Sequence, residues 1–185
     1  MKINKAIILA AGASERLGSP KALVELNGQT LVQLVCKKLR NANLEVIVVT
    51  RISLGKKIQE MIPDIRVVVN PSPELGRTGT IQCAIESIGI GPILITPVDR
   101  PGFSHETVSA LSKCKTTTIP TYEGKGGHPI AITSEDCETI LLADPDTPLR
   151  ELINPDRMRV NDPHLHLNID TENDVNQLLK VVKYL

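Results

Sequence analysis

Short apolar runs that alternate with amphipathic segments constrain the fold of this chain more than any other feature. Residues 6–9 and 45–49 are almost continuously apolar, which is typical of strands buried on both faces of a sheet. Between them, residues 30–39 repeat leucine and valine at helical spacing, with Thr30 as the N-cap. Since strands separated by helices need crossover connections, the pattern predicts an α/β fold with a mainly parallel sheet and helices on both faces.

The alternation continues beyond the second strand. Further strands are predicted at residues 66–69, 92–96, 116–120, 129–133 and 165–169, and further helices at residues 53–62, 78–88, 104–111, 147–153 and 171–182. No repeat or linker interrupts the chain, so we expect a single Rossmann-like domain over residues 1–185. Ligands bind such folds at the carboxyl ends of strands, and the loops after residues 9, 69, 96 and 169 are the expected sites.

Charge and composition argue against several classes of protein. The 185 residues carry 21 Lys and Arg against 21 Asp and Glu, which is not the basic excess of a nucleic-acid or acidic-membrane binder. Aromatic residues make up 2% of the chain, too few for a platform that stacks single-stranded nucleic acid. No stretch approaches the roughly 20 apolar residues of a membrane span. We therefore expect neither a nucleic acid nor a membrane as partner.

The cysteines predict a reducing environment. Cys36, Cys83, Cys114 and Cys137 form no CxxC pair, and their wide spacing within apolar segments favours buried thiols over a zinc site. The apolar run at residues 6–11 is shorter than the about 7–15 residues of a signal-peptide core, so a buried first strand explains it better. We expect a cytoplasmic protein.

The loop after the first strand carries the most chemical information. Residues 9–21 read LAAGASERLGSPK, in which small residues let backbone N–H groups approach an anion and Arg16 and Lys21 supply two cations. The segment is neither a Walker A loop nor a GxGxxG turn, since Ser14 stands where the second glycine would be. Composition alone leaves two interpretations open, a triphosphate-binding loop and an ordinary turn with exposed charges.

The full motif resembles that of the MobA-like NTP transferases, whose signature pairs a Leu-Ala-Ala/Gly-Gly loop with a later Arg and Lys. The Leu-Ala-Ala-Gly form, with Ala11, is most similar to the molybdenum cofactor cytidylyltransferase branch of that family. The resemblance extends over nearly the whole chain. Its later motifs match residues 70–80, the Pro97–Pro101 segment PVDRP, the Gly-His-Pro at residues 127–129, and residues 168–174.

The resemblance implies a fold of the nucleotide-diphospho-sugar transferase type and a role for each matched position. Nucleotide binding is implied for Leu9, Ala10, Ala11, Gly12, Ser14, Arg16, Lys21, Asn70, Gly79 and Thr80. Acceptor binding is implied for Pro101 and His128, and catalysis for Arg16, Lys21, Asp99 and Asp170. Two departures are an added charge at Arg77 and the absence of the consecutive serines that the family often has near Thr80.

The aspartates are the expected metal ligands. Asp99 follows an apolar strand and stands between two prolines, and a rigid carboxylate there can hold Mg²⁺. The resemblance makes Asp170 the second ligand. Each has an ordinary alternative: Asp99 can be a turn residue, and Asp170-Thr171 also reads as a helix N-cap, with Asp174 as the next candidate ligand.

The implied reaction transfers a nucleoside monophosphate, with CMP from CTP as the expected group, to a phosphorylated acceptor and releases pyrophosphate. The implied acceptor is molybdopterin, with a molybdoenzyme or a cofactor-delivery protein as a further partner. Two alternatives remain open at this point. One is a nucleotidyltransferase for a sugar phosphate or another phosphorylated metabolite, and the other is a non-catalytic protein that binds nucleotide or cofactor.

Overall fold

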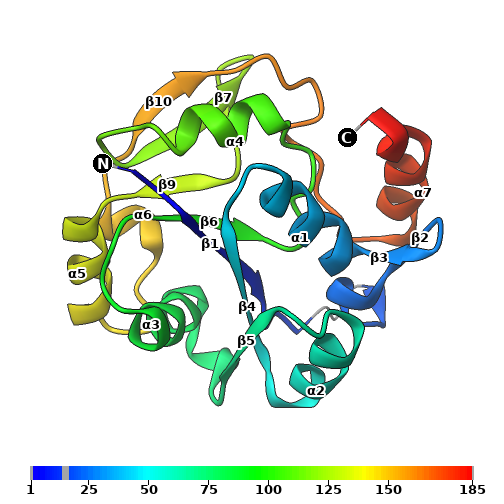
Figure 1. The fold of residues 1–185 in the computed structure, drawn as a ribbon, viewed down its shortest axis with the longest axis horizontal. Coiled ribbons are helices and arrows are strands. Elements are labelled where there is room, and N and C mark those ends of the chain that lie inside the picture. Colours follow the sequence, from blue (N-terminus) through cyan, green and yellow to red (C-terminus); the bar gives the residue numbers. More distant parts are fainter. Residues whose placement is uncertain (1, 14–16, 185) are drawn as a thin grey trace.

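The computed structural model describes residues 2–13 and 17–184, and in these residues the fold centres on one large sheet (Figure 1). Its strands follow the order β10-β7-β9-β6-β1-β4-β5, and β8 pairs with β7. The strands are β1 (Lys5–Ala10), β4 (Glu45–Arg51), β5 (Arg66–Asn70), β6 (Ile93–Pro97), β7 (Thr118–Tyr122), β8 (Lys125–Gly126), β9 (Ile130–Ile132) and β10 (Asp156–Arg159). A separate hairpin consists of β2 (Glu25–Leu26) and β3 (Gln29–Thr30).

The helices connect these strands as crossovers. They are α1 (Leu31–Asn41), α2 (Ile52–Met61), α3 (Arg77–Ile88), α4 (His105–Leu111), α5 (Ser134–Leu142), α6 (Leu149–Leu152) and α7 (Glu172–Val181), with 3-10 turns η2 (Lys21–Leu23), η3 (Pro73–Leu75) and η4 (Val182–Tyr184). Strand β1 pairs in parallel with both β4 and β6, and β4 pairs in parallel with β5. Two strands of the described sheet run antiparallel to their neighbours: β9 lies between β6 and β7, and β8 pairs with β7. The predicted mainly parallel α/β fold is confirmed.

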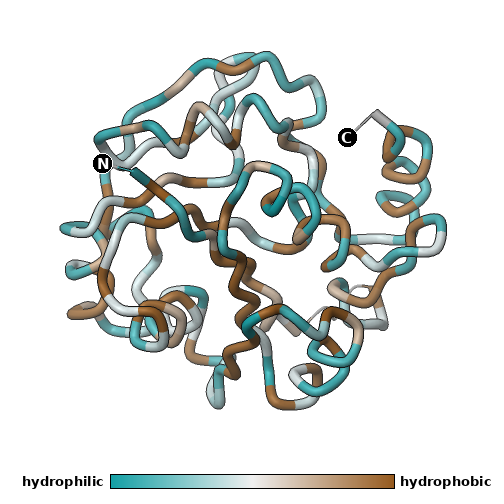
Figure 2. Tube along the Cα trace, viewed as in Figure 1, coloured by the Kyte–Doolittle hydropathy of each residue, from teal (hydrophilic) through white to brown (hydrophobic). Residues whose placement is uncertain are grey.

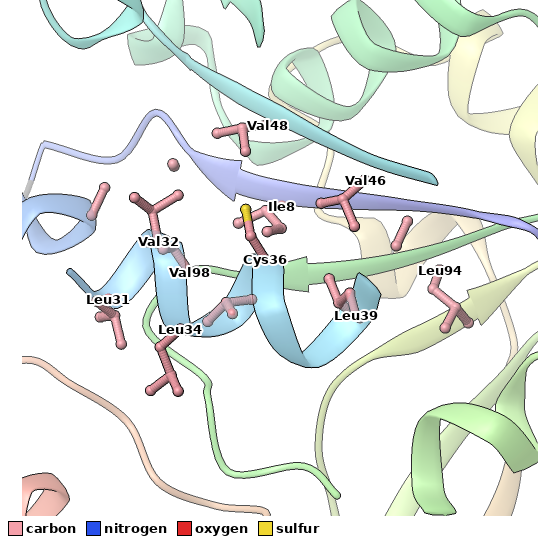
Figure 3. Close-up of a cluster of buried hydrophobic side chains, with 14 of the residues drawn as sticks. Ile8, Leu31, Val32, Leu34, Cys36, Leu39, Val46, Val48, Leu94 and Val98 are labelled. Carbon is pink, nitrogen blue, oxygen red and sulfur yellow. The ribbon is translucent and has the colours of Figure 1, made fainter. Parts of the chain in front are cut away.

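The core forms two layers because alternate residues of each central strand face opposite sides. Ile8 belongs to the cluster that α1, α2, α4 and α7 cover, whereas Ile7 belongs to the cluster under α3, α5 and α6. Figure 2 shows β4 as an almost continuous hydrophobic stretch, as expected for a strand covered on both faces. Figure 3 shows Cys36 of α1 packed beside Ile8.

Helix α1 begins as the sequence predicts. Thr30 is its N-cap, and Thr30 and Gln33 form a capping box in which the Thr30 N–H donates to Gln33 Oε1 at 2.8 Å. Ser104 likewise caps α4 by accepting the backbone N–H of Thr107 at 3.1 Å. The structure moves most element boundaries by one to three residues from those predicted.

The strand predicted at residues 165–169 is wrong. Residues 163–166 form a turn and 167–170 are irregular, and their backbone N–H groups donate to loop carbonyls instead of a neighbouring strand. Leu165 and Ile169 are nevertheless buried, because this segment packs closely against the loops that contain Gly102 and Gly127. At Gly102 an added Cβ would lie 1.7 Å from the carbonyl oxygen of His164, which shows how closely the two segments approach. Burial in an irregular segment produced an apolar pattern that resembles a strand.

Helix α5 and strand β10 were not predicted, and neither were the short strands β2, β3 and β8. Helix α5 follows β9 directly, with Thr133 as its N-cap, and β10 is a polar edge strand that pairs in parallel with β7. The four cysteines are free, with Cys36 and Cys137 buried and Cys83 and Cys114 half-buried. Among the described residues, no helix has the length and apolar character that crossing a bilayer requires.

Candidate active site

A cleft of about 590 Å³ opens at the carboxyl ends of β1 and β6, a size in the usual range for small-molecule sites. The cleft lies where the strand order reverses, because β1 has β4 as its neighbour on one side and β6 as its neighbour on the other. Nine of the predicted site residues line it together: Leu9, Ala10, Ala11, Gly12, Lys21, Thr80, Asp99, His128 and Asp170. Ser14 and Arg16 fall outside the residues that the structure describes.

Side chains of β4 hold the carboxyl end of β1 through hydrogen bonds. Thr50 Oγ1 donates to the carbonyl oxygen of Ala10 at 3.1 Å, and the guanidinium of Arg51 donates to the carbonyl oxygen of Gly12. A Cβ at Gly12 would meet no atom within 4 Å, so its backbone faces open space in the cleft. Ala10 and Ala11 are buried behind it. The loop therefore presents backbone at the cleft wall and leaves room for a ligand there.

Lys21 joins the two aspartates. Its Nζ atom lies 2.7 Å from Asp99 Oδ2 and also forms a salt bridge with Asp170 Oδ1. All three side chains are largely shielded, with exposed fractions of 15%, 22% and 19%. Burial opposes the positive charge, but the hydrogen bonds and negative charges of Asp170 and Asp99 outweigh it and raise the pKa of Lys21. The lysine is therefore a fixed cation in the cleft.

Loop contacts position Asp170 next to Asp99. The Ile169 backbone N–H donates to the Asp99 carbonyl oxygen at 3.0 Å, and Asn168 Nδ2 donates to Asp170 Oδ2 at 2.6 Å. Asp174 has a different task, because its carboxylate accepts the backbone N–H groups of Asp170 at 3.0 Å and Thr171 at 2.8 Å. Thr171 is the N-cap of α7, and it forms a capping box with Asp174. The helix start thus uses Thr171 and Asp174 and leaves the Asp170 carboxylate facing Lys21.

The segment before α3 is held by Asn70. This side chain is buried, and it donates to Thr80 Oγ1 at 3.0 Å while accepting the Ser72 N–H at 2.9 Å. Asn70 and Gly79 do not line the cleft. The N–H of Gly79 donates to the carbonyl oxygen of Pro145 at 2.9 Å, and a Cβ at Gly79 would lie 3.0 Å from Pro145 Cβ. Of the three residues predicted here, only Thr80 reaches the cleft, and Asn70 positions it.

The two predicted acceptor residues lie in different surroundings. Pro101 is buried away from the cleft, and its carbonyl oxygen accepts a hydrogen bond from Lys38 Nζ at 2.9 Å. Lys38 also lies 4.9 Å from the centre of the Phe103 ring, and burial lowers its pKa to about 8. Lys38 therefore ties α1 to the segment that follows Asp99. His128, by contrast, lines the cleft itself.

His128 has an unusual environment. Burial, together with the positive charges of Arg100 and Arg77, lowers its pKa to about 4, although Asp99 and a hydrogen bond with the Ile95 backbone act in the opposite direction. The Nδ1 atom is buried and has no hydrogen-bond partner among the described residues. At neutral pH the ring is therefore uncharged.

The donor set at Asp99 and Asp170 fits Mg²⁺. Two neighbouring carboxylates in the cleft supply the hard oxygen ligands that Mg²⁺ takes, and substrate phosphates and water normally complete its shell. The ammonium group of Lys21 now lies between them, which shows that the position favours a cation. No group of three or more His, Cys, Asp or Glu in the described residues forms a ready-made metal cage.

The fold and this cleft agree with a known family. The model of the MobA-like NTP transferase domain matches residues 6–161, which is most of the chain. The chain belongs to the MobA-like NTP transferase domain family. The match includes the loop after β1 and the Asp99 segment, although Asp170 follows its end.

Curated relatives of this MobA-like domain are named as guanylyltransferases. A probable molybdenum cofactor guanylyltransferase from Bacillus cereus (strain G9842) is 31% identical over 110 residues, which are 57% of this chain and 53% of the relative. One from Bacillus cytotoxicus is 26% identical over 117 residues, covering 60% and 57%. The chain thus spans only about half the length of the curated relatives it matches.

Solved structures share the fold over the full length. Rv0371c from Mycobacterium tuberculosis H37Rv has a TM-score of 0.83 at 20% identity, covering 97% of this chain and 100% of that one. A structure of that protein in complex with manganese has a TM-score of 0.80 at 18% identity, covering 97% and 99%. Molybdopterin-guanine dinucleotide biosynthesis protein A from Archaeoglobus fulgidus has a TM-score of 0.75 at 17% identity, covering 98% and 100%. At these identities the likeness establishes the fold.

Sequence reasoning assigned no site role to several cleft residues of this MobA-like domain. Arg77, Arg100 and Asn168 line the cleft, and Arg51 supports its floor. Arg100 and Asn168 stand inside matched motifs, so their positions were visible in the sequence. Their contribution depends on three-dimensional placement, which spacing alone does not give.

Proposed function

We propose that this chain is a nucleotidyltransferase that moves a nucleoside monophosphate from an NTP to a phosphorylated acceptor and releases pyrophosphate. The observation that carries the proposal is the shielded triad of Lys21, Asp99 and Asp170, which lines the same cleft as the loop that contains Gly12. A fixed cation, two metal-binding carboxylates and open backbone at Gly12 suit a triphosphate and its metal.

In this proposal the chain acts by positioning and by charge. Backbone N–H groups near Gly12 bind the triphosphate, and Lys21 neutralises charge on it; Arg16 is assigned the same task. An oxygen of the acceptor phosphate attacks the α-phosphorus, the bond from that phosphorus to the bridging oxygen breaks, and pyrophosphate leaves. Such in-line transfer needs no protein nucleophile.

Asp99 and Asp170 are the residues that would hold Mg²⁺, which when bound would offset charge on the phosphate oxygens. With a metal on these carboxylates, Lys21 would supply its positive charge to a phosphate. Support for a divalent ion comes from the carboxylate pair and from the manganese complex of the Mycobacterium tuberculosis protein of like fold.

The proposed donor is CTP, and the proposed acceptor is molybdopterin or the molybdenum cofactor. Ala11 supports CTP, since it lines the cleft and since the Leu-Ala-Ala-Gly form of the loop resembles that of the cytidylyltransferase branch. The curated relatives are guanylyltransferases, so GTP is the specific rival. Their names and the family support the acceptor. A cytoplasmic location and a molybdoenzyme or cofactor-delivery partner stay predictions.

The test is a pyrophosphate-release screen of CTP, GTP, ATP and UTP with Mg²⁺, against molybdopterin, molybdenum cofactor and a panel of sugar phosphates. We expect pyrophosphate only when an NTP and a molybdopterin-type acceptor are both present. If pyrophosphate were released only when the acceptor is a sugar phosphate, the acceptor would belong to that substrate class instead. Tight nucleotide binding without release from any pair would favour a non-catalytic binding protein.

A further inference from the structure

Two arginines in the cleft take no part in the salt bridges of Lys21, Asp99 and Asp170. Arg77 begins α3, and Arg100 follows Asp99 directly; both line the same cleft as Lys21. Within residues 2–13 and 17–184, no carboxylate or carbonyl oxygen accepts a hydrogen bond from either guanidinium. Lys21, by contrast, already has two carboxylate partners. The cleft thus contains a second basic region whose charge the described part of the protein does not balance.

His128 connects the two arginines. Its ring is close enough to both for their charges to disfavour the protonated form. The Nδ1 atom of His128 is buried without a hydrogen-bond partner among the described residues, so the ring has an unused polar atom in the wall of the cleft. A buried acceptor without a partner costs stability unless a ligand or water supplies a donor. This atom therefore offers a hydrogen-bonding position to a ligand in the cleft.

We propose that Arg77, Arg100 and His128 form a second anion subsite, which binds the phosphate monoester of the acceptor and a hydroxyl or N–H group beside it. The proposal rests on the proposed nucleotidyl transfer and names the acceptor class for that site. Arginine guanidinium groups match the oxygens of a phosphate in a bidentate manner, and the uncharged ring of His128 accepts the neighbouring donor.

The chemistry of in-line transfer requires such a subsite. The attacking phosphate must approach the α-phosphorus from the side opposite to the leaving pyrophosphate. One cation cannot position both anions, and two phosphates that approach each other repel unless positive charge lies on each side. Lys21 and the loop at Gly12 serve the donor, and Arg77 and Arg100 serve the acceptor. The subsite therefore selects a phosphate as nucleophile over an uncharged alcohol.

Inorganic phosphate titrated into the substrate-free protein tests the subsite without turnover. Calorimetry on wild type, Arg77→Gln and Arg100→Gln should give a Kd at least about tenfold weaker in each variant, as expected when one charged hydrogen-bond donor is lost. Arg157→Gln is the matched control, because this exposed arginine lies on β10 outside the cleft. An unchanged Kd in both cleft variants would overturn the inference.

Steady-state kinetics separate this inference from the proposed function. Both cleft variants should raise the KM for the acceptor and leave the KM for the NTP near the wild-type value. A rise confined to the KM for the NTP would overturn the acceptor subsite and leave nucleotidyl transfer intact. Absence of pyrophosphate release from every NTP in wild type would overturn the proposed function, while the phosphate titration would still decide whether the arginines bind an anion.

Discussion

The backbone N–H of Ile169 donates to the carbonyl oxygen of Asp99 over 3.0 Å. This contact fixes the backbone next to Asp170 against the segment that carries Asp99, so the two carboxylates meet on Lys21 although they come from distant parts of the sequence. Because the contact is between backbone atoms, changing either side chain should leave the arrangement of the two segments in place.

Asp99→Asn and Asp170→Asn should therefore weaken the same Mg²⁺ site. If the two carboxylates share one ion, loss of either removes a ligand charge, and the effects on Mg²⁺-dependent turnover should be clearly non-additive. Thermal melts in EDTA should change little, since each variant keeps one carboxylate on Lys21. Strictly additive losses would argue for two separate roles.

Asp174→Asn is the matched control for that cycle. Asp174 completes the capping box of α7, so the substitution should reduce the free energy of unfolding by about 1 kcal/mol. Dependence of turnover on Mg²⁺ should remain as in wild type. If Asp174→Asn shifted the Mg²⁺ dependence while Asp170→Asn did not, the second ligand would be Asp174.

Lys21→Ala should lower kcat by roughly 10²–10³, the usual effect of removing one preorganised charge contact to a transition state. The protein should remain folded, because Lys21 lies in a short turn at the cleft and does not belong to the hydrophobic core cluster. The checks are single-turnover rates and melting curves. Turnover within a few-fold of wild type would remove Lys21 from the mechanism.

Ala11→Gly should shift donor preference toward GTP. Ala11 lines the cleft, and one methyl group in a binding pocket discriminates between substrates by roughly tenfold or more. The measurement is kcat/KM for CTP and GTP in both proteins. A wild-type enzyme that already prefers GTP would show that the donor is that named for the curated relatives and that Ala11 does not set the choice.

His128 should make the substrate-free protein less stable in mild acid. The pKa is about 4 in the folded protein against an ordinary value of 6.5, so the unfolded chain binds the proton first as pH falls. Stability is fully present above pH 6.5 and is lost toward pH 4, by roughly 3 kcal/mol from this group. Denaturant unfolding of wild type and His128→Gln from pH 7.5 to 4 measures it. Parallel pH profiles for the two proteins would refute the environment described for His128.

Elements with a strong local signal were predictable from the sequence. The apolar run at Ile7 and Ile8 and the helical spacing after Thr30 required no knowledge of the rest of the fold, and both are confirmed. The segment at residues 165–169 was not predictable in this way. Its burial depends on packing over Gly102, a long-range contact that gives an irregular segment the apolar pattern of a strand.

Some residues of the candidate site were predictable from local motifs, and others were not. Lys21 and Asp99 lie in recognisable motifs, and they meet in the cleft. The N–H of Gly79 donates to the carbonyl oxygen of Pro145, and the carbonyl oxygen of Pro101 accepts a hydrogen bond from Lys38. Both contacts join segments that meet only in the folded chain, so the sequence did not predict them. The sequence left open whether Asp170 or Asp174 is the second metal ligand. The structure places Asp174 in the capping box of α7 and Asp170 on Lys21, which supports Asp170 through contacts that the sequence does not give.

The central claim is that the protein transfers the nucleoside monophosphate of an NTP, which contains the α-phosphorus, to the phosphate of an acceptor. The most direct measurement follows label from α-³²P-CTP and γ-³²P-CTP in parallel reactions with Mg²⁺ and molybdopterin. The account predicts that the α label appears in the acceptor product and the γ label in pyrophosphate, and that Lys21→Ala suppresses both. Label released as CMP or as inorganic phosphate, with none in the acceptor, would contradict it.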